Sequence, residues 1–112
     1  MTMACDILIS GGGIAGLTAA AAFGTAGFNV VCVDPTPPVT DGAAKGADMR
    51  STAMLQPARR VLEAAGIWAH LEEHAAPLQV MRIVDAGGDG DALVTSRAFD
   101  AADISDQPFG WN

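Results

Sequence analysis

The sequence predicts an α/β fold that begins with a strand–helix–strand (βαβ) unit. Residues 6–10, DILIS, form a short apolar run that ends at a cluster of glycines, as expected of a buried strand in a parallel sheet. The alanine-rich residues 14–27 favour a helix, and Gly27 is a good residue to end it. Residues 28–34, FNVVCVD, form a second β-branched run. Together the three segments indicate two parallel strands joined by a right-handed helical crossover.

The segment after the second strand, residues 35–50, is predicted to be a loop because it holds three prolines, two glycines and scattered charges. A helix is expected over residues 56–66, QPARRVLEAAG, with Pro57 in its first turn and Gly66 at its end. Its buried face is expected to carry Ala58, Val61, Leu62 and Ala65. Its solvated face is expected to carry Arg59 and Arg60.

The remaining chain has weaker patterns. Residues 67–74 predict a further helical turn or two, and residues 78–99 predict two strands around a glycine-rich hairpin turn. Residues 100–112 show no clear periodicity. We expect two domains, with residues 1–76 in the first and residues 77–112 opening the second.

The uncharged run between Asp6 and Asp34 is long enough to span a bilayer, but its composition argues against a membrane helix or a secretion signal. It contains six glycines, and no basic segment precedes it. The net charge of −7 argues against a nucleic-acid partner and against electrostatic attraction to anionic lipid. Cys5 and Cys32 fit neither a disulfide framework nor a metal site, so we expect a cytoplasmic protein with free thiols.

Three glycines between the first strand and the helix, Gly11, Gly13 and Gly16, match the pattern Gly-x-Gly-x-x-Gly. The first permits a tight turn, the second lets backbone approach a pyrophosphate, and the third lets the helix pack against the strand. The helix N-terminus, at Ile14 and Ala15, would point free N–H groups and a partial positive charge at the phosphates. This context predicts a partial Rossmann-like nucleotide-binding domain.

Asp34 stands 18 positions after Gly16, at the end of the second strand. A carboxylate there can accept hydrogen bonds from both hydroxyls of an adenosine ribose, and it would repel a 2′-phosphate. These residues therefore predict FAD or NAD as the cofactor in preference to NADP. The alternative is a glycine-rich turn with an unrelated acid at the strand end.

The segment DMRSTAMLQPARRVLEAAGIW, residues 48–68, resembles the single-component aromatic-ring hydroxylases, which are FAD-dependent monooxygenases. The resemblance is strongest to the ubiquinone-biosynthesis hydroxylases, such as the 2-polyprenyl-6-methoxyphenol hydroxylases. Those enzymes carry Asp-x-Arg, a Thr-Ala-Leu-like run and a helix that ends Leu-Gly-Leu-Trp or similar. This order is matched here by Asp48, Arg50, Thr52, Ala53, Ala65, Gly66 and Trp68. The hairpin MRIVDAGGDG and the closing FGWN also look like the entry to that family's substrate domain.

The resemblance implies FAD as cofactor, NADH or NADPH as electron donor, and a phenolic or polyprenyl-phenol substrate from ubiquinone biosynthesis. It also implies that Arg50 touches FAD near its pyrophosphate, where a guanidinium can bridge phosphate oxygens with two parallel hydrogen bonds. The alternative is a surface arginine paired with Asp48. On the same basis, residues 77–112 would be the incomplete start of a substrate-binding domain. Catalytic residues are not identified.

The resembled enzymes are several times longer, so we expect an N-terminal fragment that is inactive alone. Such a fragment is expected to form a homo-oligomer, because open strand edges and apolar sheet faces would lack cover. The complete enzyme would be cytoplasmic or peripheral to the inner membrane. A second interpretation is a non-catalytic module that binds NAD or AMP, or that serves protein interactions.

Two patterns resemble metal sites without meeting their requirements. His70 and His74 lie four positions apart, but Leu71 stands where a zinc protease carries glutamate. Residues 85–92, DAGGDGDA, lack the later glutamate of an EF-hand calcium loop, so a hairpin turn is expected there. No metal is therefore predicted.

Overall fold

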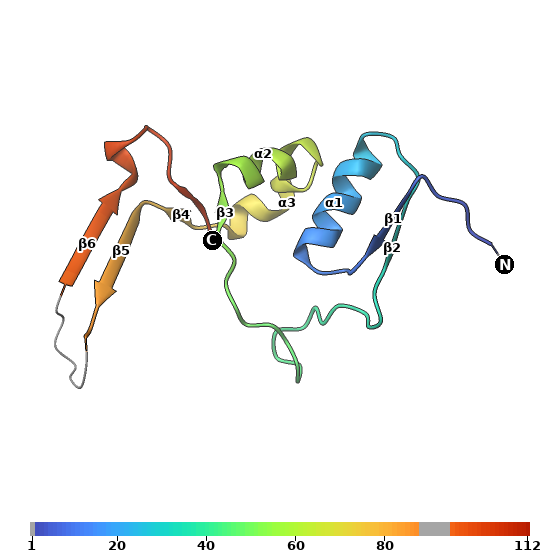
Figure 1. The fold of residues 1–112 in the computed structure, drawn as a ribbon, viewed down its shortest axis with the longest axis horizontal. Helices are drawn as coiled ribbons and strands as arrows, with labels where there is room; N and C mark the ends of the chain where they lie inside the picture. The colour runs from blue at the N-terminus through green and yellow to red at the C-terminus, as the bar shows by residue number, and fades with distance from the viewer. Residues whose placement is uncertain (1, 88–94) are drawn as a thin grey trace.

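The computed structural model describes residues 2–87 and 95–112, and Figure 1 shows an elongated chain in three parts. A βαβ unit lies at one end, two antiparallel strands lie at the other, and short helices with a small sheet lie between them. The principal extents are 62 × 37 × 23 Å, and the radius of gyration is 18.8 Å. A compact domain of this length would have a radius of gyration of roughly 13 Å. The mixed α/β class is as predicted, but the chain is far from globular.

The first part is the predicted strand–helix–strand unit. β1 (Ile7–Ser10) and β2 (Val30–Val33) pair in parallel over their full lengths, and α1 (Ile14–Thr25) connects them. α1 ends where Gly27 takes a φ of 97°, a conformation that costs glycine little. The arrangement brings the carboxyl ends of both strands to the same edge, beside the N-terminus of α1.

The pattern of the first strand is typical of a buried strand, but in the structure one face of β1 stays uncovered, as was expected for sheet faces of a fragment. α1 packs against one face, where a Cβ added at Gly16 would lie 3.5 Å from Cγ2 of Ile9. Leu8 points to the opposite face and is 65% exposed. Within residues 2–87 and 95–112, no second layer fully covers the face of β1 opposite α1. Leu8, part of the apolar run that indicated a buried strand, is therefore exposed to solvent.

The middle part holds the predicted helices. α2 (Gln56–Ala64) begins with a proline in its first turn, and Gly66, with a φ of 74°, follows its end. α3 (Trp68–Leu71) and the 3₁₀ turn η1 (Glu72–His74) supply the further turns expected from the sequence. One residue assigned to the buried face differs, since Val61 is 45% exposed where it lines an open groove beside α1.

A three-stranded sheet that the sequence did not predict joins the end of the chain to these helices. β3 (Met54–Leu55) and β4 (Pro77–Leu78) flank β7 (Gly110–Trp111), and both pair with it in antiparallel fashion. Gly110 is required here, because a Cβ would overlap the carbonyl oxygen of Met54. Strands of two residues carry no periodic pattern, so sequence analysis misses them.

The buried core lies where β7 meets α2 and α3. It is formed by Leu62, Trp68 and Trp111, and the two indole rings meet edge to face with centroids 5.4 Å apart. Trp111 belongs to the second predicted domain and the other two residues to the first. The division at residue 76 stays a prediction, and the two ranges share this core.

Arg59 is not on a solvated face of α2 as expected. Its guanidinium carbon lies 4.2 Å from the ring centroid of Trp111 and 5.0 Å from that of Trp68, and its side chain is 24% exposed. Nε of Arg59 also donates a hydrogen bond to Glu63 at 2.7 Å. The delocalised cation and long apolar stem of arginine suit an indole face. Arg60, by contrast, is exposed as expected.

The third part is an antiparallel pair of strands, β5 (Val80–Asp85) and β6 (Thr95–Asp100), followed by the 3₁₀ turn η2 (Ala101–Asp103). The predicted hairpin thus starts two residues later than expected, because Leu78 belongs to β4. Most of its predicted turn falls outside the described residues. Every residue of β5 is exposed, so this ribbon buries little apolar surface.

No helix in residues 2–87 and 95–112 is suited to cross a membrane. None of them combines the length and the apolar character that a bilayer span requires.

Candidate functional site

The loop between β1 and α1 is a tight glycine turn. Gly11 has a φ of 112°, which residues with a Cβ rarely adopt. Gly16, in the first turn of α1, lies directly against this loop, and a Cβ there would overlap the carbonyl oxygen of Gly11. The two glycines therefore allow the close approach of helix and strand end that the motif predicts.

Gly13 leaves the N-terminus of α1 open. It is the N-cap residue, no side chain caps the helix, and the first turn carries no acidic residue. A Cβ at Gly13 would meet nothing within 4 Å. The first N–H groups of the helix, including those of Ile14 and Ala15, have no intrahelical acceptor, and they carry the positive end of the helix dipole. A phosphate group fits such a place.

Asp34 is held at the end of β2 by three donors. Its Oδ2 accepts a hydrogen bond from the Gly12 amide at 2.8 Å, and its Oδ1 accepts from the Thr36 amide at 3.0 Å and the Thr36 hydroxyl at 3.4 Å. The hydrogen bond from Gly12, followed by those from Thr36, lowers the pKa of the Asp34 carboxyl below its ordinary value. Asp34 is therefore an oriented, ionised acceptor beside the glycine turn.

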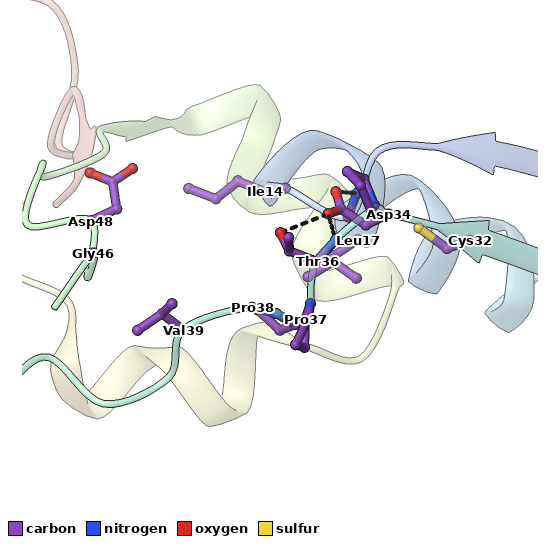
Figure 2. A pocket seen from close by; sticks show the side chains of 13 residues that line it. Ile14, Leu17, Cys32, Asp34, Thr36, Pro37, Pro38, Val39, Gly46 and Asp48 are labelled. Carbon is purple, nitrogen blue, oxygen red and sulfur yellow. Dashed lines mark hydrogen bonds between the residues drawn. The ribbon is translucent and has the colours of Figure 1, made fainter. Parts of the chain in front are cut away.

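A cavity of about 700 Å³ opens beside Asp34 and the helix N-terminus, and Figure 2 shows the residues that line it. One side comes from the glycine turn and α1, and the other from the proline-rich loop after β2. The lining residues are Gly12, Gly13, Ile14, Leu17, Cys32, Asp34, Pro35, Thr36, Pro37, Pro38, Val39, Gly46 and Asp48. This volume is within the usual range of small-molecule sites, and a mainly apolar wall with few polar groups is typical of them.

Arg50 lies in the same loop but does not line the cavity. Its side chain is 87% exposed, and its Nε and Nη2 donate to Asp48 at 2.8 and 2.6 Å. These hydrogen bonds hold the pKa of the Asp48 carboxyl at about 2, and Asp48 raises the pKa of Arg50. The pairing with Asp48 that was the alternative for Arg50 is present, and its contact with a cofactor stays a prediction.

The structure thus brings together most of the residues that the sequence singled out. Gly13, Ile14 and Asp34 line the cavity, while Gly11, Ala15 and Gly16 build the turn and helix behind it. The sequence analysis missed other lining residues, most of them in the proline-rich loop after β2. That loop was interpreted only as a connection, although its position beside the glycine turn could have indicated a cavity wall. In this loop the missed lining residues are Pro35, Thr36, Pro37, Pro38, Val39, Gly46 and Asp48, and in the βαβ unit they are Gly12, Leu17 and Cys32.

The residues present fit the adenosine diphosphate half of FAD. The open space at Gly13 would accommodate a phosphate, an ionised carboxylate lies where it could accept hydrogen bonds from a ribose, and the cavity continues along apolar side chains. A metal ion finds no comparable support, since the described ranges contain no group of three or more His, Cys, Asp or Glu residues able to hold one.

Comparison with known proteins agrees with this geometry. A family model described as "FAD binding domain" matches residues 4–108. Ubiquinone hydroxylase UbiL of Rhodospirillum rubrum is 38% identical to this chain over 82 residues, a match that covers 73% of the chain and 19% of that protein. The chain thus spans about a fifth of the length of the curated relative it matches. The resemblance to FAD-dependent hydroxylases, ubiquinone hydroxylases among them, is confirmed, and the chain belongs to the FAD binding domain family.

Proposed function

We propose that this chain is the N-terminal FAD-binding portion of a flavin-dependent monooxygenase that hydroxylates an aromatic ring. The observation that carries the proposal is the hydrogen bond between Asp34 and the Gly12 amide, which joins a ribose acceptor to a phosphate-binding turn at the edge of one cavity. The family match and the ubiquinone hydroxylase relative support the flavin and the reaction class.

In this proposal the βαβ unit is the start of a Rossmann-like domain. The N–H groups at Gly13 and the first turn of α1 would hold the pyrophosphate, and Asp34 would accept from the ribose hydroxyls. The ionised Asp34 disfavours a 2′-phosphate, so the adenosine site suits FAD or NAD. Bound FAD would supply the redox chemistry, with NADH or NADPH as the electron donor of the complete enzyme.

The proposed substrate is a phenolic or polyprenyl-phenol intermediate of ubiquinone biosynthesis, of the kind used by 2-polyprenyl-6-methoxyphenol hydroxylases. It rests on the similarity to ubiquinone hydroxylase UbiL, of which the matched region covers 19%. The proposed place of action is cytoplasmic or peripheral to the inner membrane, where a polyprenylated phenol would partition. Catalytic residues stay unassigned.

Calorimetric titration of the chain with ADP, FAD and NAD tests the cofactor assignment. We expect ADP and FAD to bind, and Asp34→Ala to weaken ADP binding between about tenfold and a hundredfold, because hydrogen bonds to a charged group are lost. Asp41→Ala is the matched control, since Asp41 lies in the same loop and caps only the Ala43 amide. Equal ADP affinity in Asp34→Ala and Asp41→Ala would disprove the assignment.

A second candidate function is a non-catalytic module that binds NAD or AMP, or that serves protein interactions. It is favoured by one observation, that the whole cavity is built from residues 12–48. The same titration separates the two. Binding of NAD or AMP with exclusion of FAD would favour the module, whereas tighter binding of FAD than ADP would favour the flavoprotein.

A further inference from the structure

Two carboxylates, those of Asp34 and Asp48, line the proposed cofactor cavity, and the proposed function gives a role only to Asp34. Asp34 and Asp48 lie at opposite ends of the cavity in Figure 2. Asp34 is bonded to the glycine turn. Asp48 lies within the loop that follows β2, and a bare negative charge there would repel the pyrophosphate of an incoming nucleotide.

The charge of Asp48 is not unpaired, because its carboxylate accepts three hydrogen bonds from Arg50. Its Oδ1 accepts from the Arg50 amide at 3.1 Å and from Nε at 2.8 Å, and its Oδ2 accepts from Nη2 at 2.6 Å. The Asp48 carboxylate therefore binds one side of the guanidinium and also holds the backbone of Arg50 in place. The pair is neutral as a unit, so the charge of Asp48 is offset where it borders the cavity.

This geometry uses two of the five guanidinium N–H groups. The side-on contact takes Nε–H and one N–H of Nη2, so both N–H groups of Nη1 and the second of Nη2 stay available. Those remaining groups form the second donor edge of the fork, which matches two oxygens of a phosphate. The Arg50 side chain is 87% exposed, and a ligand can reach that edge.

We propose that Asp48 is a positioning residue for phosphate: it holds Arg50 side-on, so that the free Nη1–Nη2 edge of the guanidinium binds a phosphate oxygen of a nucleoside diphosphate. The inference rests on the proposed function, because Asp48 lines the proposed nucleotide cavity and holds Arg50 beside it. An exposed ion pair adds little to folding stability. Its contribution is to arginine geometry, since a long side chain held in one orientation loses less freedom when the phosphate binds.

The direction in which one substitution changes ADP affinity separates a positioning role of Asp48 from a purely electrostatic effect of its charge. Asp48→Asn removes a negative charge beside the cavity, and if charge alone mattered, ADP would bind more tightly. If Asp48 positions Arg50, ADP binds more weakly, because asparagine cannot accept both charge-assisted hydrogen bonds. Adenosine, which has no phosphate, should bind equally well in either case.

The experiment is calorimetry of the 112-residue chain with ADP and with adenosine, for the unaltered chain, Asp48→Asn, Arg50→Lys and the double variant. We expect ADP affinity to fall about tenfold in each single variant, as for the loss of one charged hydrogen bond, with adenosine affinity unchanged. The double variant should bind ADP no more weakly than Arg50→Lys, because both substitutions remove the same contact. Asp41→Asn in the same loop is the matched control and should change neither affinity.

The outcomes are distinguishable. Unchanged or tighter ADP binding in Asp48→Asn overturns the positioning role while leaving the proposed function intact, and so does a double variant whose losses simply add. Equal losses for ADP and adenosine overturn it as well, because they report a general distortion of the loop, which circular dichroism would also register. Absence of both ADP and adenosine binding in the unaltered chain overturns the proposed function and this inference together.

Discussion

Asp34 and Gly12 are 22 positions apart in sequence, and a 2.8 Å hydrogen bond from the Gly12 amide to Oδ2 of Asp34 joins them. Through this bond, the end of β2 fixes the glycine turn at the end of β1. The side chain that would receive a ribose thus also shapes the turn that would receive phosphate. A change at either residue is expected to act on both halves of the site.

The pKa shift of Asp34 predicts how adenosine binding depends on pH. The carboxyl pKa lies below its ordinary value of 3.8, because the Gly12 and Thr36 donors favour the ionised form. Stabilisation from these bonds is therefore present above the ordinary value and is lost as the pH falls through the lowered pKa. Adenosine affinity measured by calorimetry should stay constant between about pH 5 and pH 8. An apparent pKa inside that interval would contradict the assignment of Asp34 as the acceptor.

Gly16 and Gly24 in α1 form a matched pair for the packing of the helix. Gly16→Ala should destabilise the chain by about 1–3 kcal/mol, because its methyl group meets the Gly11 carbonyl oxygen. Gly24→Ala should stabilise it by about 0.5–1 kcal/mol, since the space there is open and alanine favours helix. Urea unfolding followed by circular dichroism measures both. Similar effects of the two substitutions would show that α1 does not approach the turn as described.

Arg59 and Arg60 are adjacent in α2 and should differ in their contribution to stability. Arg59→Ala should cost about 1–2 kcal/mol, because it removes a cation and an apolar stem from the faces of Trp68 and Trp111. Arg60→Ala, at an exposed position, should change stability by less than about 0.5 kcal/mol. The comparison uses the same unfolding measurement. Equal losses would place both side chains in the same environment and refute the cation–indole contact.

The 112-residue chain alone is predicted to be inactive as a hydroxylase. The cavity built by residues 12–48 is proposed to hold the adenosine diphosphate half of FAD alone, and the matched region is 19% of the ubiquinone hydroxylase relative. Oxygen uptake with NADH or NADPH and a phenol should not exceed that of a control without protein. Coupled formation of a hydroxylated phenol by this chain would contradict the prediction.

The chain is expected to self-associate when it is prepared alone. It exposes 8610 Å² of surface, whereas a compact monomer of the same mass would expose roughly 5,800 Å². Large apolar side chains are exposed on β1 and along the β5–β6 ribbon, among them Leu8, Val80, Met81, Ile83, Val84 and Phe99. Open strand edges next to apolar side chains favour pairing between copies. Light scattering at micromolar concentration should show dimers or larger species, and a monomer that melts cooperatively would refute the expectation.

Local sequence signals were sufficient for the βαβ unit and the main helices. The glycine spacing, the β-branched runs and the breaks at Gly27 and Gly66 all act within a few residues, so the pattern reports them directly. The same holds for the positions of Gly13 and Asp34, which stand at a helix start and directly after a strand, as predicted.

Features that depend on long-range contacts were not predictable. In the β3–β7–β4 sheet, strands of two residues pair over long sequence separations, more than 50 positions between β3 and β7 and more than 30 between β4 and β7. The position of Arg59 depends on Trp111, which lies next to the last residue and is 52 positions away in sequence. The exposure of Leu8 on one face of β1 has a related reason, because the composition of a strand does not show whether a second layer covers it.

The placement of the two tryptophans has a practical consequence. The chain has no tyrosine, and its two tryptophans, Trp68 and Trp111, contact each other where α3 meets β7. Near-ultraviolet absorbance and emission therefore report almost exclusively on that contact, while the nucleotide-binding end of the molecule is optically silent. A flavin added at that end would bring its own visible absorption. Two regions of one small chain can thus be followed at separate wavelengths, without any introduced label.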